Sequence, residues 1–160
     1  MSNAAAPKPK AVPALRLDDY LPYRLSVAAN EVSRLVARAY DDRFGITSPQ
    51  WRILANLAEH GPSTPLEIGR YTVMDKVTVS RAAQGLLQRG LLDRRPNGAD
   101  GRSHILALSA DGVALHNEVA PLAAEFERAL LDQWSPQDVE RLHAQLKLIE
   151  QTAARLASER

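Results

Sequence analysis

The chain has 160 residues, 45% of them hydrophobic, and a formal net charge of +1. This length and apolar content allow one domain with a buried core. Cysteine is absent, which excludes structural disulfides and any thiol-based switch within the chain. No run approaches the roughly 18 apolar residues that a membrane span needs, and the N-terminus lacks the apolar core of a signal peptide. We therefore expect a cytoplasmic protein with no membrane partner.

The charge is unevenly distributed along the sequence. Residues 70–104 hold seven Lys or Arg against three Asp, whereas residues 105–160 hold five Lys or Arg against nine acidic residues. A basic segment in a nearly neutral chain is expected where phosphate groups are contacted.

The N-terminal part predicts a tail followed by two helices. Residues 1–16 are rich in Ala, Pro and Lys without periodicity, which predicts a disordered tail. A first helix should begin near Pro22 and end by Gly45, with one apolar face formed by Leu25, Ala29, Val32, Val36 and Tyr40. Ser48 is the expected N-cap of a second helix that runs from Pro49 to about His60.

Two shorter helices should follow. Thr64, Pro65 and Glu67 form a capping-box pattern that predicts a helix through about Tyr71. After a turn, Asp75 is the expected N-cap of another helix, and Gly90 should end it. Its inner face carries the apolar residues Val79, Ala82, Ala83, Leu86 and Leu87. Its outer face carries Val77, Arg81, Gln84, Gly85 and Gln88.

A basic β-hairpin is predicted directly after this helix. Leu91 to Arg95 read as a first strand, residues 96–101 as a turn, and His104 to Leu108 as the returning strand. A short helix joined to such a hairpin is the layout of a winged helix-turn-helix, which reads duplex DNA. Arg81 and Gln84 have the side-chain geometry that fits base edges in the major groove.

The hairpin tip has two possible roles. Arg102 suits the minor groove, where narrow width concentrates negative potential. Alternatively, Asp100 and Arg102 form an exposed ion pair in a solvated turn. With these positions included, the residues predicted to contact double-stranded DNA are Lys76, Val77, Thr78, Ser80, Arg81, Gln84, Arg94, Arg95, Arg102, Ser103 and His104.

The C-terminal part predicts two long helices. Ser109 should cap the first, which Pro121 should bend; its inner side would carry Val113, Val119, Leu122, Phe126 and Leu130. Ser135, Pro136 and Asp138 should start the last helix. That helix has an apolar seam at alternating three- and four-residue spacing, formed by Val139, Leu142, Leu146, Ile149, Ala153 and Leu156. The seam needs a covering helix, which could be the first helix of the same chain or a helix of a second copy.

From about Leu17 onward the sequence resembles the MarR-type transcriptional regulators. The wing pattern is D-x-R followed by L-[ST]-x-x-G, seen as Asp100, Arg102, Leu108, Ser109 and Gly112, and Thr47 to Trp51 with Leu54 match the opening of the second helix. Gly85 departs from the usual recognition-helix pattern and costs about 1 kcal/mol relative to alanine. We therefore expect Gly85 to permit a close approach.

The resemblance implies a mainly α fold with a small β-hairpin wing. A single domain would span residues 17–160, with a winged helix-turn-helix at 46–109 and dimerisation helices at 17–45 and 110–160. It also implies that the terminal helices of two chains interlock into a homodimer. Two copies can occupy half-sites one helical turn apart on a pseudo-palindrome, which one short helix and one wing cannot do.

The resemblance further implies a small aromatic carboxylate or phenolic effector, bound between the dimerisation helices and the reading module. The residues that could hold it are Tyr20, Tyr23, Arg24, Trp51 and Arg52. Trp51 could instead be a core residue, and the two arginines could lie on solvated helix faces.

Other functional classes find less support in the sequence. His60, His104, His116 and His143 lack metal-ligand spacing, so no metal site is predicted. Motifs for catalysis or for cofactor binding are missing as well. The alternative to a DNA-binding repressor is a winged-helix protein-interaction module without specific DNA binding. Such a module should expose apolar anchors where this chain has Arg81, Gln84 and Gln88.

Overall fold

The computed structural model describes residues 15–98 and 103–159. The predicted tail falls almost entirely outside this range, as do Asp100 and Arg102. The chain divides into two compact units, Met1–Arg34 and Leu35–Arg160. The first contains a short 3₁₀ helix, Leu17–Asp19, and most of α1, Leu21–Ala37. All other helices and both strands belong to the second unit.

The predicted first helix is wrong at its C-terminal end. α1 stops at Ala37, a turn follows, and a separate short helix, α2 (Asp41–Phe44), ends at Gly45 with a φ of 61°. In the turn, the N–H groups of Arg38, Ala39 and Tyr40 bond carbonyls three residues earlier, which tightens the last turn. The break places Ala39 and Tyr40 in the core, where both are buried.

α3 spans Ser48–His60, and its N-cap is Thr47 rather than the predicted Ser48. The Thr47 hydroxyl accepts a bond from the Gln50 amide N–H at 3.4 Å, while Gln50 Oε1 accepts one from the Thr47 amide at 3.0 Å. The Ser48 hydroxyl has another partner, because the Tyr40 hydroxyl donates to it at 3.0 Å. Thr47 therefore caps the helix, whereas the adjacent Ser48 binds Tyr40.

The helix-turn-helix follows the predicted boundaries closely. α4 runs from Pro65 to Thr72 with both halves of the Thr64–Glu67 capping box formed, and α5 runs from Lys76 to Gln88. The N-cap of α5 is Asp75, as predicted. Gly90 follows its C-terminus with a φ of 69°, the left-handed backbone that lets a glycine end a helix.

The predicted hairpin is present as β1 (Leu92–Pro96) and β2 (His104–Leu108). The first strand starts one residue later than expected and the second has the expected bounds. The strands are antiparallel, with Leu92 opposite Leu108 and Pro96 opposite His104. Ser63 adds a bridge that the sequence did not predict, exchanging two backbone bonds of 3.0 and 2.9 Å with Leu106.

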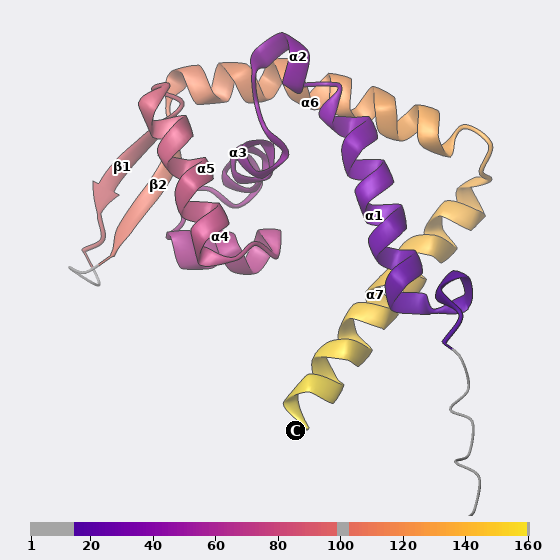
Figure 1. Ribbon diagram of the computed structural model, residues 1–160. Helices are drawn as coiled ribbons and strands as arrows, with labels where there is room; N and C mark the ends of the chain where they lie inside the picture. The colour runs from indigo at the N-terminus through magenta and orange to yellow at the C-terminus, as the bar shows by residue number, and fades with distance from the viewer. Residues whose placement is uncertain (1–14, 99–102, 160) are drawn as a thin grey trace, which may run out of the picture. The chain divides into compact units, whose positions relative to one another are not determined.

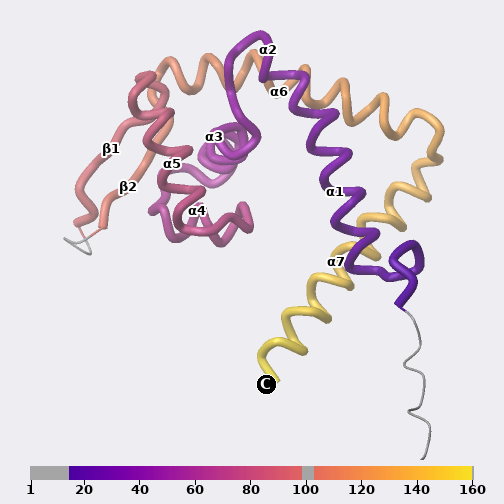
Figure 2. Tube along the Cα trace, viewed as in Figure 1, coloured from indigo at the N-terminus to yellow at the C-terminus, as the bar shows by residue number. Residues whose placement is uncertain are grey.

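The core of the second unit lies around α3. This helix packs against α4, α5, β2 and α6, and β1 packs on α5; Figure 1 shows the hairpin running alongside α5. The tube in Figure 2 shows α3, α4 and α5 grouped beneath the first part of α6. The largest fully buried side chains are Ile46, Ile53, Leu54, Ile68, Val79, Leu86, Leu106 and Val119.

Two long helices complete the chain, α6 (Ala110–Leu131) and α7 (Pro136–Ser158). Ser109 and Ser135 cap them, as predicted. On α6, Val119 is buried, and Leu122 and Phe126 pack on the core. Val113 and Leu130, predicted on the same inner side, are 45% and 41% exposed, because only part of this face meets α3 and β2. Pro121 lies inside α6; the expected bend there stays a prediction.

Within the described ranges, no helix combines the length and apolar character that crossing a bilayer requires.

Candidate nucleic-acid interface

α5 separates an apolar face from a polar one. Its predicted inner residues are buried, apart from the half-buried Leu87. Lys76, Val77, Ser80, Arg81, Gln84 and Gln88 are all exposed. Burial of the inner face therefore leaves a guanidinium and two carboxamides facing solvent along one helix, which is the arrangement that base reading needs.

The start of α5 is held by Asp75. Its carboxylate accepts bonds from the amides of Val77 and Thr78 at 2.8 and 2.9 Å, and the Thr78 hydroxyl donates to it at 2.6 Å. These bonds lower the pKa of Asp75, with the Thr78 hydroxyl as the largest cause, since each stabilises the charged form. Thr78, one of the predicted DNA contacts, is half-buried and serves this cap.

Of the predicted DNA contacts in the wing that the structure describes, two are exposed and two are half-buried. Arg94 and Arg95 are exposed on β1, and successive residues of a strand face opposite sides. Ser103 and His104 are half-buried, and the Asn97 side chain donates to the Ser103 hydroxyl at 2.6 Å, closing the described part of the hairpin. The pKa of His104 is lowered, first by burial and second by the nearby Arg94 charge.

The wing and α6 are tied to the end of α5 by backbone contacts. Leu91 O accepts from the Ser109 amide at 3.2 Å, and the Ser109 hydroxyl donates to Gly90 O at 2.6 Å. The same hydroxyl accepts from the Gly112 amide at 3.0 Å. A Cβ at Gly112 would lie 2.1 Å from Leu91 O. The spacing from Ser109 to Gly112 therefore has a physical basis: a cap and a close backbone contact.

The sequence predicts Gly85 on the outer face of α5. In the structure it lies against α3 instead. A Cβ there would be 2.6 Å from Gln50 Nε2, so the predicted close approach exists and its partner is Gln50. Arg89, just beyond α5, donates to the carbonyls of Phe44 and Gly45, each at 2.8 Å. The sequence predicted no such contact for Gln50 or Arg89. The unusual glycine at position 85 was a signal for the contact with Gln50, whereas no local pattern indicated the Arg89 contact.

The five candidate effector residues are distributed over the two units of the chain. Tyr20, Tyr23 and Arg24 belong to the first unit and are exposed, whereas Trp51 and Arg52 lie on α3 in the second. Arg52 is exposed. Trp51 is half-buried and packs on the core, consistent with its structural alternative.

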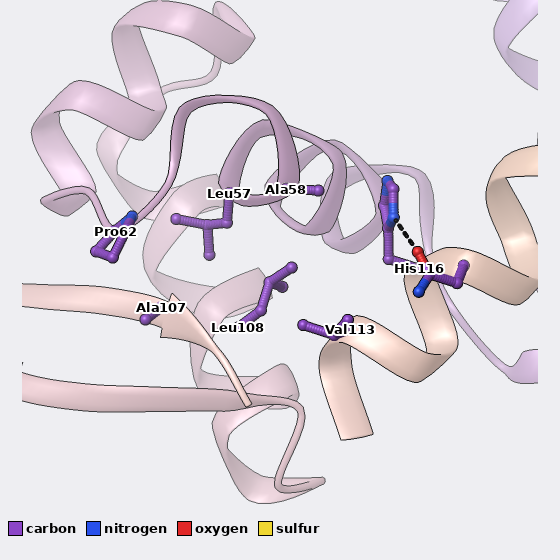
Figure 3. A pocket seen from close by; sticks show the side chains of 8 residues that line it. Leu57, Ala58, Pro62, Ala107, Leu108, Val113 and His116 are labelled. Carbon is purple, nitrogen blue, oxygen red and sulfur yellow. Dashed lines mark hydrogen bonds between the residues drawn. The ribbon is translucent and has the colours of Figure 1, made fainter. Parts of the chain in front are cut away.

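Trp51 belongs to an aromatic stack. Its ring lies 5.7 Å from that of Tyr40 and 5.5 Å from that of His116, with interplanar angles of 26° and 14°. His116 also lines a hollow of about 380 Å³, formed mainly by apolar side chains from α3, the loop after it, β2 and α6. Figure 3 shows the side chains that line it. Nδ1 of His116 lies 3.5 Å from Oδ1 of Asn117. Among the described residues, no arginine or lysine lines the hollow, and an anionic effector would need such a cation.

The seam predicted on α7 is partly exposed. No residue of this helix is buried: Val139, Leu142 and Ile149 are half-buried, and Leu146, Ala153 and Leu156 are exposed. In the part of the chain that the structure describes, no three His, Asp or Glu side chains gather as a metal site.

The chain is similar to known regulators. A sequence profile of the MarR family matches residues 44–103. The transcriptional regulator YwoH of Bacillus subtilis is 31% identical over 69% of this chain and 82% of its own length. The transcriptional repressor NicR of Pseudomonas putida is 29% identical over 67% of this chain and 72% of its own.

The fold is also found in solved structures. Bordetella bronchiseptica BpsR, whose DNA binding is regulated by 6-hydroxynicotinic acid, matches with a TM-score of 0.77 and 21% identity. The match covers 86% of this chain and 97% of that one. YwoH and NicR are both transcriptional regulators. Together with the capped recognition helix and the wing, the similarities establish that this chain belongs to the MarR family of DNA-binding transcriptional regulators.

Proposed function

We propose that this regulator binds a pseudo-palindromic operator as a homodimer and represses transcription. The observation that carries the proposal is the exposed polar face of α5, fixed by a buried inner face and an N-terminal cap. Arg81 and Gln84 are assigned to base edges in the major groove, where guanidinium and carboxamide groups can form paired hydrogen bonds. Repression is the activity named for NicR.

The other predicted contacts take supporting roles. Lys76, Ser80 and the wing residues Arg94 and Arg95 supply charge and hydrogen bonds to phosphates, which set affinity without reading sequence. Val77, 58% exposed on the outer face, offers an apolar contact to a thymine methyl. Thr78, Arg102, Ser103 and His104 complete the proposed DNA-contacting set.

Dimerisation is supported by the partly exposed seam of α7. An apolar stripe with six regularly spaced residues and none buried is expected to pack against another helix. A second copy provides one, and it also supplies the second reader that a specific operator requires. A chromosomal target agrees with the cytoplasmic location that we expected from the sequence.

We also propose a small aromatic carboxylate or phenol as effector. The support is the ligand named for BpsR, together with the ring of Trp51 and the guanidinium of Arg52 on one helix of this chain. Tyr20, Tyr23 and Arg24 are the sequence-based candidates for the remaining contacts. Loss of operator binding on titration with aromatic acids would support this assignment, and substitution of Arg24 or Arg52 should raise the concentration required.

The operator proposal is tested by selecting bound duplexes from a random pool and then comparing variants on the selected and on random sequences. Arg81→Ala should weaken specific binding by about 1–3 kcal/mol and relax the preference at one base pair. Arg128→Ala, an exposed arginine of α6, is the charge-matched control and should leave that preference intact. An equal loss on both duplexes for Arg81→Ala would reject its role in base reading. If no duplex is enriched, the protein-interaction module becomes the better description.

A further inference from the structure

The C-terminal half of α5 contacts residues 44–50, which comprise the last residue of α2, the loop after it and the first three residues of α3; we call this segment the connector. Arg89 binds its first two residues, and Gly85 lies against its last residue, Gln50. Gly85 and Arg89 are four residues apart, so both contacts lie on one side of the helix. Two contacts one turn apart restrict both the rotation of a helix about its axis and its tilt.

The Arg89 contact satisfies groups that a helix end leaves open. Phe44 and Gly45 lie at the C-terminus of α2, where carbonyls have no partner within the helix. The planar guanidinium donates through two nitrogens to both carbonyls at 2.8 Å. Arg89, 44 positions after Gly45, therefore supplies hydrogen bonds to the open carbonyls at the end of α2. The same bonds hold the C-terminal end of α5 in place.

The Gln50 contact depends on a fixed amide. Gln50 Oε1 accepts from the Thr47 amide at 3.0 Å and from the Thr47 hydroxyl at 3.2 Å, which orients the side chain. Its Nε2 then occupies the space that a Cβ at Gly85 would need. The glycine that costs helix stability thus leaves room for the Gln50 amide, which an added Cβ would force to move.

We propose that Arg89 and Gln50 are positioning residues for DNA reading: they contact no base, but fix α5 so that Arg81 and Gln84 do. Base-edge contacts require side chains to be held within about 0.5 Å, and both readers precede the anchored turn on a helix of only 13 residues. This inference depends on the proposed function. The competing role for Arg89 is a direct phosphate contact, since this residue is exposed.

The experiment compares the full-length wild-type protein with Arg89→Met and Arg89→Lys on the selected operator and on random duplex, at several salt concentrations. Arg89→Met keeps the apolar stem and loses the donors. We expect its specific affinity to fall about tenfold while its random affinity and salt slope stay unchanged. Arg89→Lys should recover part of the loss, because an ammonium can reach one carbonyl. Arg128→Met controls for the lost charge.

Amide hydrogen exchange measures the same anchoring without DNA. In Arg89→Met, amides of residues 82–89 should exchange faster while those of α3 stay protected. An equal loss on both duplexes with a smaller salt slope would identify Arg89 as a phosphate contact and overturn the proposal, as would unchanged exchange in residues 82–89. A wild type that prefers no duplex would refute the proposed function instead, and the exchange result would still decide the anchoring.

Discussion

Gly85 and Gln50 compete for the same space between α5 and α3. In the wild-type background, Gly85→Ala gains about 1 kcal/mol of helix propensity but must displace the Gln50 amide from its capping bonds with Thr47. We expect these effects to cancel. With Gln50→Ala already in place, the obstacle is gone and Gly85→Ala should stabilise by the full amount of about 1 kcal/mol.

Urea unfolding of the two single variants and the double variant measures this coupling. The same gain in both backgrounds would mean that the Gln50 side chain is free to move away and that the contact has no energetic weight.

Val73 has a left-handed backbone, which is unusual for a residue with a side chain. It lies in the turn between α4 and α5 with a φ of 53° and is 89% exposed. A left-handed backbone costs a side-chain-bearing residue about 1–2 kcal/mol, and glycine avoids this cost. Val73→Gly should therefore raise the free energy of unfolding by about 1 kcal/mol, after the greater chain entropy of glycine is subtracted.

Val77→Gly is the matched control, because Val77 is also exposed but lies within α5. There glycine should lower the free energy of unfolding by about 0.5 kcal/mol. Thermal or urea unfolding measures both changes. If the free energy of unfolding changed in the same direction for both variants, strain at Val73 would be ruled out.

At the scale of elements, the start of α6 is locked to the end of α5 by Gly112. A Cβ at this position would meet a backbone oxygen of Leu91 at 2.1 Å, and a backbone atom cannot rotate away. Gly112→Ala should lower the free energy of unfolding by about 1–3 kcal/mol. Gly98→Ala, with open space around its added Cβ, should stay within about 0.5 kcal/mol of wild type. Equal midpoints in urea for the two variants would contradict the locked junction.

The wing should be sensitive to acid through His104. Its pKa in the folded chain lies below the ordinary value of 6.5, because burial and then Arg94 disfavour the charged ring. The unfolded chain therefore binds the proton more readily, so this contribution to stability is complete above pH 6.5 and is lost as the pH falls below it.

His104→Gln removes this titration. Between about pH 7.5 and about pH 5.5, the melting temperature of the wild type should fall more than that of His104→Gln, since the other histidines are common to both. Parallel falls in the two proteins would show that His104 makes no pH-dependent contribution.

The helix starts could be predicted because caps are local chemistry. Thr64 with Glu67, Asp75, Ser109 and Ser135 each bond amides within three residues, and the sequence contains both partners. The choice of Thr47 over Ser48 could not be predicted, because Tyr40, eight residues from Ser48, engages that hydroxyl.

The same distinction applies to the site. The polar face of α5 follows from helical periodicity alone, whereas Arg89 reaches carbonyls 44 and 45 positions away. The proposed effector residues depend on how separate helices converge, which no spacing in one sequence determines. Trp51 illustrates the limit: its neighbour His116 is 65 positions away and in another helix.

For the whole molecule, the seam of α7 predicts the oligomeric state. Leu146 lies in the seam and is 36% exposed, and a carboxylate there should prevent another helix from covering it. Leu146→Asp should therefore sediment as a monomer at micromolar concentrations where the wild type is a dimer. Leu148→Asp alters a leucine of the same helix outside the seam, and should remain dimeric.

Circular dichroism should show that both variants stay helical. If the wild type were a monomer, or if both variants remained dimers, the seam would not be the dimer interface.

The junction formed by Leu91, Ser109 and Gly112 also bears on how such a regulator could be controlled. Backbone contacts there join the recognition helix, the wing and α6 without a flexible linker between them. Among the described residues, we therefore expect α5, the two strands and the start of α6 to move as one body, so that the helix and the wing enter their grooves together. In a dimer the remaining variable is the separation of the two readers, so an inducer should act on that distance, and operators with altered half-site spacing should reproduce its effect.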